Sequence, residues 1–386
     1  MTHHVLRAIE LVGVVGSITS IGYYLACFWS AEKFLRDSES LHEAEARLPP
    51  VSILKPLKGT DPNMYECFRS HCLQEYPEYE IVFGVSDPQD PAAELVERLR
   101  NEFPQHAIRL VHCERNLGSN TKVSNLAQML AEARYEYILV NDSDIRVPPD
   151  YLRRVSAPLA DPGVGLVTCP YRGVANETLG SKLESLGIST DFVPGVLVAR
   201  AIEGVKFGLG STLLFPRQEL KAIGGFEALV DYLGDDYQIG KRIAELGRCV
   251  VVSDVVVDSY LPRYTFRSFL DHQVRWARTV KDERFGGYLG LAVTFGVPWA
   301  LLALIASGGA LWTWALFVTV VAVRFALAGY IRVRVLRDRQ PRLLRWLLLR
   351  DMLAAWVWLI SFTGRTVHWR GAVFELKGGK LARIGT

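Results

Sequence analysis

The stretch YEYILVNDSDIRV, residues 135–147, decides the fold class that this sequence predicts. Its apolar part, residues 137–140, has the β-branched and aromatic composition of a buried strand, and it stops abruptly at Asn-Asp-Ser-Asp. Asp142 and Asp144 would therefore follow a strand end, which is the edge where open α/β sheets bind ligands. Two carboxylates this close repel each other unless a cation lies between them, and their oxygen atoms suit Mg²⁺ or Mn²⁺. Taken alone, however, Asp-x-Asp is more often a solvated turn than a metal site, so the choice between the two depends on the rest of the sequence.

Strand-like and helix-like segments alternate on both sides of this stretch. Strands are expected at residues 51–55, 80–87, 107–113 and 164–168, and helices at residues 63–74, 92–101 and 122–133. This alternation of strands and helices predicts a mostly parallel sheet with helices on both faces. Asp87 ends one of the strands, so the sheet would carry it to the same edge as Asp142.

The composition excludes some classes of protein. The 386 residues are enough for one large domain with additional segments. The net charge of only +3 does not suggest a protein that binds nucleic acid. The six cysteines form no Cys-x-x-Cys pair, so neither a zinc site nor a disulfide framework is expected. Hydrophobic residues make up 49% of the chain and are concentrated at its two ends, which points to membrane segments there.

The first apolar segment is long enough to cross a bilayer. Residues 11–29 carry no charge, and no small-residue cleavage site follows them, so a membrane anchor is favoured over a signal peptide. Lys33 and Arg36 lie after this segment, whereas Arg7 in front of it is offset by Glu10. This asymmetry weakly favours a cytoplasmic position for the large middle segment.

The last third of the chain also has the composition of a membrane region. Residues 287–306 and 311–331 are each long enough to span, although Arg324 interrupts the second. A short uncharged connection joins them and a strongly basic stretch follows, as in a hairpin that enters from the cytoplasm and returns to it. The apolar residues 352–363 are too few to span, so we expect a re-entrant or interfacial segment and a cytoplasmic tail.

Two further stretches contain candidate site residues. Gly208 and Gly210 in FGLGS fit a tight turn and a close backbone approach to a phosphate or sugar about equally well. Asp235 and Asp236 precede a helix-like segment, where acids can complement the helix dipole or supply a general base. Residues 263–286 then form an amphipathic pattern rich in Arg, Trp and Phe, typical of a helix at a membrane interface.

The ordered motifs resemble those of a known family. Residues 51–276 are similar to membrane glycosyltransferases of the ceramide glucosyltransferase family, which is glycosyltransferase family 21, related to family 2, and includes bacterial hopanoid glycosyltransferases. The matching motifs are VSILKPLKG from residue 51, FGVSDPQDP from residue 83, VNDSDIRV from residue 140, GDDYQ from residue 234 and HQVRW from residue 272. The resemblance implies a GT-A fold, an α/β architecture with a Rossmann-like, mostly parallel sheet, joined here to α-helical transmembrane segments.

The resemblance also implies roles for individual residues. Asp87 would contact the nucleoside, Asp142 and Asp144 would hold a divalent metal, Mg²⁺ or Mn²⁺, and Asp236 would be the general base. The remaining residues that it assigns are Lys55, Lys122 and Arg275 at the nucleotide sugar, and Trp276, His272 and Asp235 at the closure over donor and acceptor. Two positions depart from the family, because His272 stands where it has Gln or Arg, and Asp144 where animal ceramide enzymes have Gly.

Together these features predict an enzyme bound to a membrane. We expect an anchor at residues 1–32, a cytoplasmic GT-A domain at 48–262, an interfacial helix at 263–286 and a C-terminal membrane region at 287–386. The expected reaction is inverting transfer of a hexose or N-acetylhexosamine from a UDP-sugar to a hydroxyl of a ceramide-like or hopanoid lipid, at the bacterial inner membrane. A processive polysaccharide synthase and a non-catalytic membrane scaffold are the alternatives.

Overall fold

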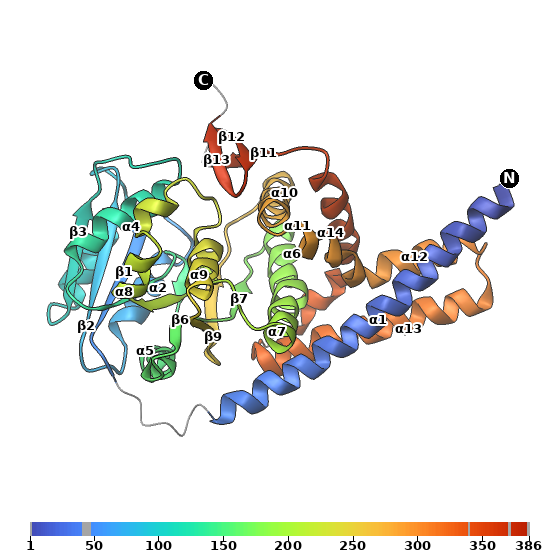
Figure 1. Ribbon diagram of the computed structural model, residues 1–386, viewed down its shortest axis with the longest axis horizontal. Coiled ribbons are helices and arrows are strands. Elements are labelled where there is room, and N and C mark those ends of the chain that lie inside the picture. Colours follow the sequence, from blue (N-terminus) through green and yellow to red (C-terminus); the bar gives the residue numbers. More distant parts are fainter. Residues whose placement is uncertain (1, 41–47, 339, 370–371, 384–386) are drawn as a thin grey trace. The chain divides into compact units, whose positions relative to one another are not determined.

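The computed structural model describes residues 2–40, 48–338, 340–369 and 372–383 of the chain (Figure 1). The chain divides into two compact units. We call them the sheet unit, made of Leu35–Val174, Ile202–Pro262 and Gly379–Thr386, and the helical unit, made of Met1–Phe34, Ala175–Ala201 and Arg263–Gly378.

A seven-stranded sheet forms the centre of the sheet unit. In spatial order its strands are β3 (Ala107–His112), β2 (Tyr79–Val85), β1 (Val51–Leu57), β4 (Tyr137–Val140), β8 (Leu213–Pro216), β6 (Val164–Thr168) and β9 (Cys249–Val252). All neighbours are parallel except at β8, which runs antiparallel to both β4 and β6. The predicted mostly parallel sheet is therefore confirmed. Its central strands are buried almost continuously, as expected for a sheet covered on both faces.

Short helices and a small second sheet complete this unit. The helices are α2 (Met64–Cys72), α3 (Ala92–Glu102), α4 (Thr121–Glu132), α5 (Tyr151–Ser156), α8 (Arg217–Ala222) and α9 (Asp235–Glu245). The small sheet has the order β5 (Ile145–Arg146), β10 (Val257–Tyr260) and β7 (Tyr171–Val174). One further strand, β13 (Lys380–Arg383), also belongs to the sheet unit.

The helical unit contains the long apolar helices of the chain (Figure 1). Its helices are α1 (Thr2–Ser40), which continues into the start of the sheet unit, α6 (Leu179–Gly187), α7 (Val193–Ile202), α10 (Phe266–Glu283), α11 (Phe285–Gly290), α12 (Gly296–Ala306), α13 (Leu311–Tyr330) and α14 (Leu347–Ser361). A hairpin of β11 (Thr366–Trp369) and β12 (Ala372–Lys377) follows them. Among the residues that the structure describes, three helical stretches are long and apolar enough to cross a membrane, or four if a bent pair of helices counts as one span: His3–Ser38, Leu179–Ile202 and Leu311–Val335, with the bent pair described below.

The structure changes two of the expectations for membrane segments. The single span expected at residues 287–306 is broken into Phe285–Thr294 and Gly296–Ala306, which are bent by 58°. Pro298 lies in the first turn of α12, where proline is compatible with a new helix but not with the continuation of an old one. In addition, Leu179–Ile202, which the sequence analysis did not predict as a span, is a helical stretch long and apolar enough to be one.

Small residues and buried polar groups hold the helices of this unit together. A Cβ atom at Gly13 of α1 would lie 2.7 Å from the backbone nitrogen of Ala303 in α12, so glycine is needed for this close approach. Arg324 of α13 is 3% exposed and donates to Asp351 of α14 and to Asp191, each at 2.6 Å. Asp191 lies in the π-helical turn Ile188–Phe192 that connects α6 to α7.

Candidate active site

The end of strand β4 is fixed by a buried amide. Asn141 donates from Nδ2 to the hydroxyl of Tyr151 at 3.0 Å and to the backbone oxygen of Ser211 at 2.6 Å. Its Oδ1 lies 3.2 Å from Nε2 of His71, which is also fully buried. These contacts give the turn at Asp142 and Asp144 one defined conformation. Sequence reasoning missed this role of Asn141, although a buried amide at a strand end was visible in the motif.

Lys55 lies beneath the same turn. Its side chain is fully buried, and its Nζ donates to the backbone oxygen of Asp142 at 2.9 Å. Burial lowers the pKa of Lys55 from its usual value to about 8. Since Lys55 binds the main chain from inside the protein, we assign it to positioning the strand end rather than to direct contact with a nucleotide sugar.

Lys122 contacts two of the candidate site carboxylates, Asp142 and Asp235. It lies in the first turn of α4, where the Asn120 side chain caps the helix by accepting from the backbone nitrogens of Lys122 and Val123. Its Nζ is 2.8 Å from Oδ1 of Asp142 and 3.2 Å from Oδ2 of Asp235. Although burial lowers the pKa of Lys122, the neighbouring carboxylates outweigh this effect and raise it above its usual value. A permanent positive charge therefore lies between the two carboxylates.

Gly210 borders the carboxylates of Asp142 and Asp236. A Cβ atom placed on Gly210 would lie 3.1 Å from Oδ2 of Asp236 and 3.4 Å from Oδ2 of Asp142, so both carboxylates face this glycine. Gly208 has a different role, because its backbone nitrogen donates to the backbone oxygen of Asp236 at 3.2 Å. The two glycines thus shape a tight turn that also brings the backbone close to the acidic cluster.

Asp236 and Asp144 have raised pKa values. Burial, and then the charge of Asp235, raise the pKa of Asp236 to about 6. Burial, and then the charge of Asp142, raise the pKa of Asp144 to about 7, while the Ser259 hydroxyl donates to its Oδ2 at 2.6 Å. Such values are typical of acids crowded together at a functional site. The sheet unit brings together six of the predicted residues: Lys55, Lys122, Asp142, Asp144, Asp235 and Asp236.

Asp87 lies two residues after the last residue of β2 and is exposed. Its Oδ1 accepts from the backbone nitrogen of Gln89 at 2.9 Å, which fixes the turn after the strand. Because β2, β1 and β4 are consecutive and parallel, Asp87 is at the same edge of the sheet as Asp142.

His272, Arg275 and Trp276, the three predicted site residues of the HQVRW motif, lie on α10, in the helical unit. Arg275 donates to Nδ1 of His272 at 2.9 Å, and the rings of His272 and Trp276 have centroids 5.4 Å apart. Nε2 of His272 lies 3.5 Å from Oε1 of Glu184 in α6, and Gln273 donates to Oε2 of Glu184 at 2.5 Å. The buried Glu184 is therefore a partner of the motif that sequence reasoning missed.

A divalent metal at Asp142 and Asp144 would need further ligands from outside the protein, such as substrate phosphates and water. Among the residues that the structure describes, no group of three or more His, Cys, Asp or Glu side chains could hold a metal ion. Asp142 and Asp144 nevertheless fit a site of the magnesium type, which commonly uses one or two carboxylates and completes its ligands with substrate phosphates and water.

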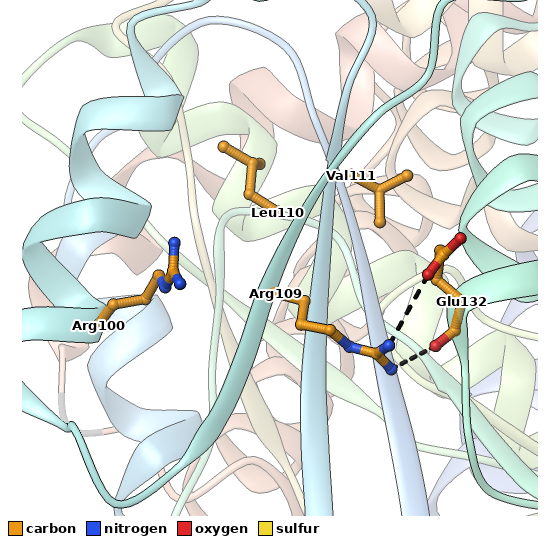
Figure 2. A pocket seen from close by; sticks show the side chains of 5 residues that line it. All are labelled: Arg100, Arg109, Leu110, Val111 and Glu132. Carbon is orange, nitrogen blue, oxygen red and sulfur yellow. Dashed lines mark hydrogen bonds and ion pairs between the residues drawn. The ribbon is translucent and has the colours of Figure 1, made fainter.

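A cavity of about 360 Å³ lies elsewhere in the sheet unit and is not part of this site. Figure 2 shows its lining, which is Arg100, Arg109, Leu110, Val111 and Glu132. Glu132 ends the 12-residue helix α4, whose first turn carries Lys122. The cavity is therefore separated from the carboxylates by the length of that helix, about 18 Å at the standard rise.

The fold is that of GT-A glycosyltransferases. A mannosyltransferase from Pyrobaculum calidifontis, solved in complex with GDP-Man and Mn²⁺, is similar to this chain with a TM-score of 0.53 and 22% sequence identity. The similarity covers 89% of this chain and 99% of that one. The fold class expected from the sequence, including helices that could span a membrane, is confirmed.

The chain belongs to glycosyl transferase family 21, whose family model matches residues 12–382. Ceramide glucosyltransferase 3 of Caenorhabditis elegans is 27% identical over 61% of this chain and 51% of its own length. A ceramide glucosyltransferase of Komagataella phaffii is 34% identical over 27% of this chain and 21% of its length. The chain thus spans about half the length, or less, of these curated relatives. The resemblance found in the sequence is confirmed.

Proposed function

We propose that the protein transfers a hexose or N-acetylhexosamine from a UDP-sugar to a hydroxyl of a membrane lipid, of the ceramide or hopanoid type. The observation that carries this proposal is the cluster of Asp142, Asp144 and Asp236 at the sheet edge, where Lys122 contacts Asp142 and Asp235, the neighbour of Asp236. Family membership supports glycosyl transfer, and the names of the relatives support a sphingolipid-like acceptor.

Asp142 and Asp144 are the proposed holders of a divalent metal, Mg²⁺ or Mn²⁺. When bound there with the donor diphosphate, such an ion neutralises the negative charge that develops on the leaving group. The Pyrobaculum calidifontis mannosyltransferase was solved with Mn²⁺, which supports a metal in proteins of this fold. Asp87, at the same sheet edge, is the proposed contact for the nucleoside.

Asp236 is the proposed general base. Its pKa of about 6 leaves the carboxylate largely ionised at neutral pH, yet basic enough to accept the proton of an incoming hydroxyl. Asp235 is less suited to this role because its Oδ2 lies 3.2 Å from the ammonium of Lys122. A single base that activates an in-line attack gives inversion at the anomeric carbon, and no second nucleophilic carboxylate is required.

Arg275, Trp276 and His272 are proposed to close over donor and acceptor, as the family motif implies. In the helical unit they form one contiguous set in which Arg275 donates to His272 and the His272 ring packs near Trp276. Glu184 of α6 secures this set, because it contacts His272 and accepts a hydrogen bond from Gln273 of α10. His272 stands where the family has Gln or Arg. A test of whether His272 contacts the sugar donor should therefore also include its partner Glu184.

The protein is proposed to work at a membrane, with the catalytic part in the cytoplasm of a bacterial cell. The helices that could span support a membrane location, and the supply of UDP-sugars favours the cytoplasmic side. Helix α14 has 15 residues, about 22 Å at the standard rise, which is short for a span, so a re-entrant or interfacial position stays the prediction. Single cysteines in the loop at residues 307–310 and near Thr386, labelled from outside with an impermeant thiol reagent, should react only in the loop.

Membranes that contain the protein, incubated with radiolabelled UDP-sugar, test the proposal against its alternatives. Labelled lipid is the expected product. Labelled polymer would instead show a processive polysaccharide synthase, and an absence of any labelled product would favour a non-catalytic scaffold. The three or four stretches of the described residues that could span a membrane are few for a channel, which supports lipid transfer over the synthase.

A further inference from the structure

A strand near the end of the sequence pairs with the loop that carries the candidate base. The backbone nitrogen of Leu233 donates to the oxygen of Gly379 at 3.1 Å, and that of Leu381 donates to the oxygen of Asp231 at 2.7 Å. Tyr232 and Lys380 form the antiparallel bridge between these two bonds. Strand β13 therefore adds an edge to the loop just ahead of Asp235 and Asp236.

Side chains reinforce this pairing. Leu381 is only 4% exposed, so its side chain is packed inside the protein. The ammonium of Lys380 lies 5.3 Å from the centre of the Tyr232 ring, and the guanidinium of Arg242 lies 5.1 Å from the same ring. Strand β13 is thus anchored by its backbone, by a buried apolar side chain and by a cation–aromatic contact.

The same loop holds the start of helix α4. Asn120 donates from its backbone to the oxygen of Val230 at 2.6 Å and from its side chain to the oxygen of Tyr232 at 2.7 Å. Ser119 donates from its backbone to Oδ1 of Asp231 at 2.9 Å. A Cβ atom on Gly118 would lie 2.6 Å from Val230, so this approach requires glycine.

Two site residues therefore depend on one loop. Lys122 follows Asn120 by two residues, and Asp235 follows Tyr232 by three, while the two side chains lie 3.2 Å apart. The loop at residues 230–233 contacts Ser119 and Asn120, which directly precede α4, and it contacts Leu381 of β13 and the preceding Gly379. Loss of β13 together with Gly379 would leave two backbone hydrogen-bonding groups of this loop, the N–H of Leu233 and the oxygen of Asp231, without these partners and free the loop to move.

We propose that β13 is a positioning strand of the active site, which holds the loop at residues 230–233 so that Lys122, Asp235 and Asp236 keep their mutual geometry. This inference rests on the proposed function for its effect on turnover. Its structural part is independent of that function. The strand is not catalytic itself, because it acts through the loop.

The test compares the intact chain with two variants in detergent micelles. One variant lacks residues 379–386, which removes both backbone partners of the loop, and the other is Leu381→Pro, which removes the N–H that donates to Asp231. Leu381→Val keeps that N–H and an apolar side chain, so it is the matched control. Hydrogen exchange of the amides in residues 116–124 and 230–240 is followed, with residues 107–112 of β3 as the internal reference, and turnover and UDP binding are measured in parallel.

In the deletion variant and in Leu381→Pro, we expect the amides of residues 230–240 to exchange faster and those of β3 to exchange as in the intact chain. In Leu381→Val, exchange should be unchanged in both segments. Turnover should fall by about tenfold to a hundredfold, the scale of a small misplacement of catalytic groups, while UDP still binds. A peptide with the sequence of residues 379–386, added to the deletion variant, should restore part of the turnover. Unchanged exchange at residues 230–240 would overturn the inference, and so would full turnover of the deletion variant. A lack of sugar transfer by the intact chain would instead refute the proposed function, and the exchange data would still decide the role of the strand.

Discussion

The ammonium of Lys122 lies 2.8 Å from Oδ1 of Asp142. This contact joins the first turn of helix α4 to the residues that follow strand β4. The Lys122 side chain is only 14% exposed and also reaches Asp235. The candidate active site is therefore organised around a positive charge that belongs to the protein itself.

Replacement of Lys122 by Met should destabilise the protein, since Asp142 and Asp235 would lose their shared cation. We expect a fall of about 1–3 kcal/mol in the free energy of unfolding, the usual cost of leaving a buried polar group unsatisfied. Thermal unfolding of the purified protein measures this change. The control is Lys221→Met, at an exposed position of α8. Equal stability of the two variants would contradict the central position of Lys122.

The Asp236→Asn variant should bind the donor nearly as well as the intact chain but turn over more slowly by roughly a hundredfold or more, the scale of a lost general base. The amide is close in size and cannot accept a proton in the same way. Steady-state rates and calorimetric binding of UDP separate the two effects. If Asp235→Asn were the more damaging change, the base would have been assigned to the wrong neighbour.

The rate should depend on pH in the direction set by Asp236. Because burial and the charge of Asp235 raise its pKa to about 6, the carboxylate takes up a proton as the pH falls through that value. The protonated acid cannot act as a base, so turnover should decline below about pH 6 and level off above it. A pH profile of turnover at saturating donor measures this. A rate that is constant from pH 5 to 8 would exclude a base with this pKa.

Gly210→Ala should lower turnover without unfolding the protein. The added Cβ would lie 3.1 Å from Oδ2 of Asp236, so this carboxylate would have to shift by a few tenths of an ångström, while Oδ2 of Asp142 at 3.4 Å would be in ordinary contact. A shift of that size at reacting groups costs about tenfold or more in rate. Gly286→Ala, where the new methyl group meets open space, is the control. Equal turnover of both variants would place Gly210 outside the site.

Arg324→Met should destabilise the helical unit. The change leaves Asp191 and Asp351 without the guanidinium that contacts both at 2.6 Å, and removing one partner of a buried ion pair costs about 3–5 kcal/mol. The exposed Arg334 in the same helical stretch provides the control, Arg334→Met. The temperature at which each detergent-solubilised variant loses its monodisperse form is the measurement. A matching temperature for the two variants would show that the buried network is dispensable.

The strands and the acidic edge were predictable from the sequence for a simple reason. Parallel strands such as β1, β2 and β4 are buried on both faces, so they appear as short apolar runs, and their carboxyl ends meet at one edge. Asp87 and Asp142 could therefore be placed at that edge from local patterns alone. The GT-A fold followed from the order of these motifs.

Contacts between distant segments were not predictable in the same way. Nothing local to Lys122 indicates that its side chain reaches Asp142, because the contact depends on how the loop before α4 packs against residues 230–232. The stretch Leu179–Ile202 was missed as a candidate span because Glu184 and Asp191 interrupt its apolar pattern. Their partners, His272 and Arg324, lie far away in the sequence.

The most direct test of the central claim is glycolipid synthesis by the purified protein. The intact chain and Asp236→Asn are each placed in lipid nanodiscs that contain a ceramide or a hopanoid polyol, and UDP-glucose or UDP-N-acetylglucosamine is added with Mg²⁺ or Mn²⁺. Mass spectrometry of the extracted lipids is the readout. We predict that the intact chain produces an acceptor lipid heavier by one sugar residue and that Asp236→Asn forms it more slowly by roughly a hundredfold or more. Donor consumption without any glycosylated lipid, or equal rates of product formation by both proteins, would contradict the account.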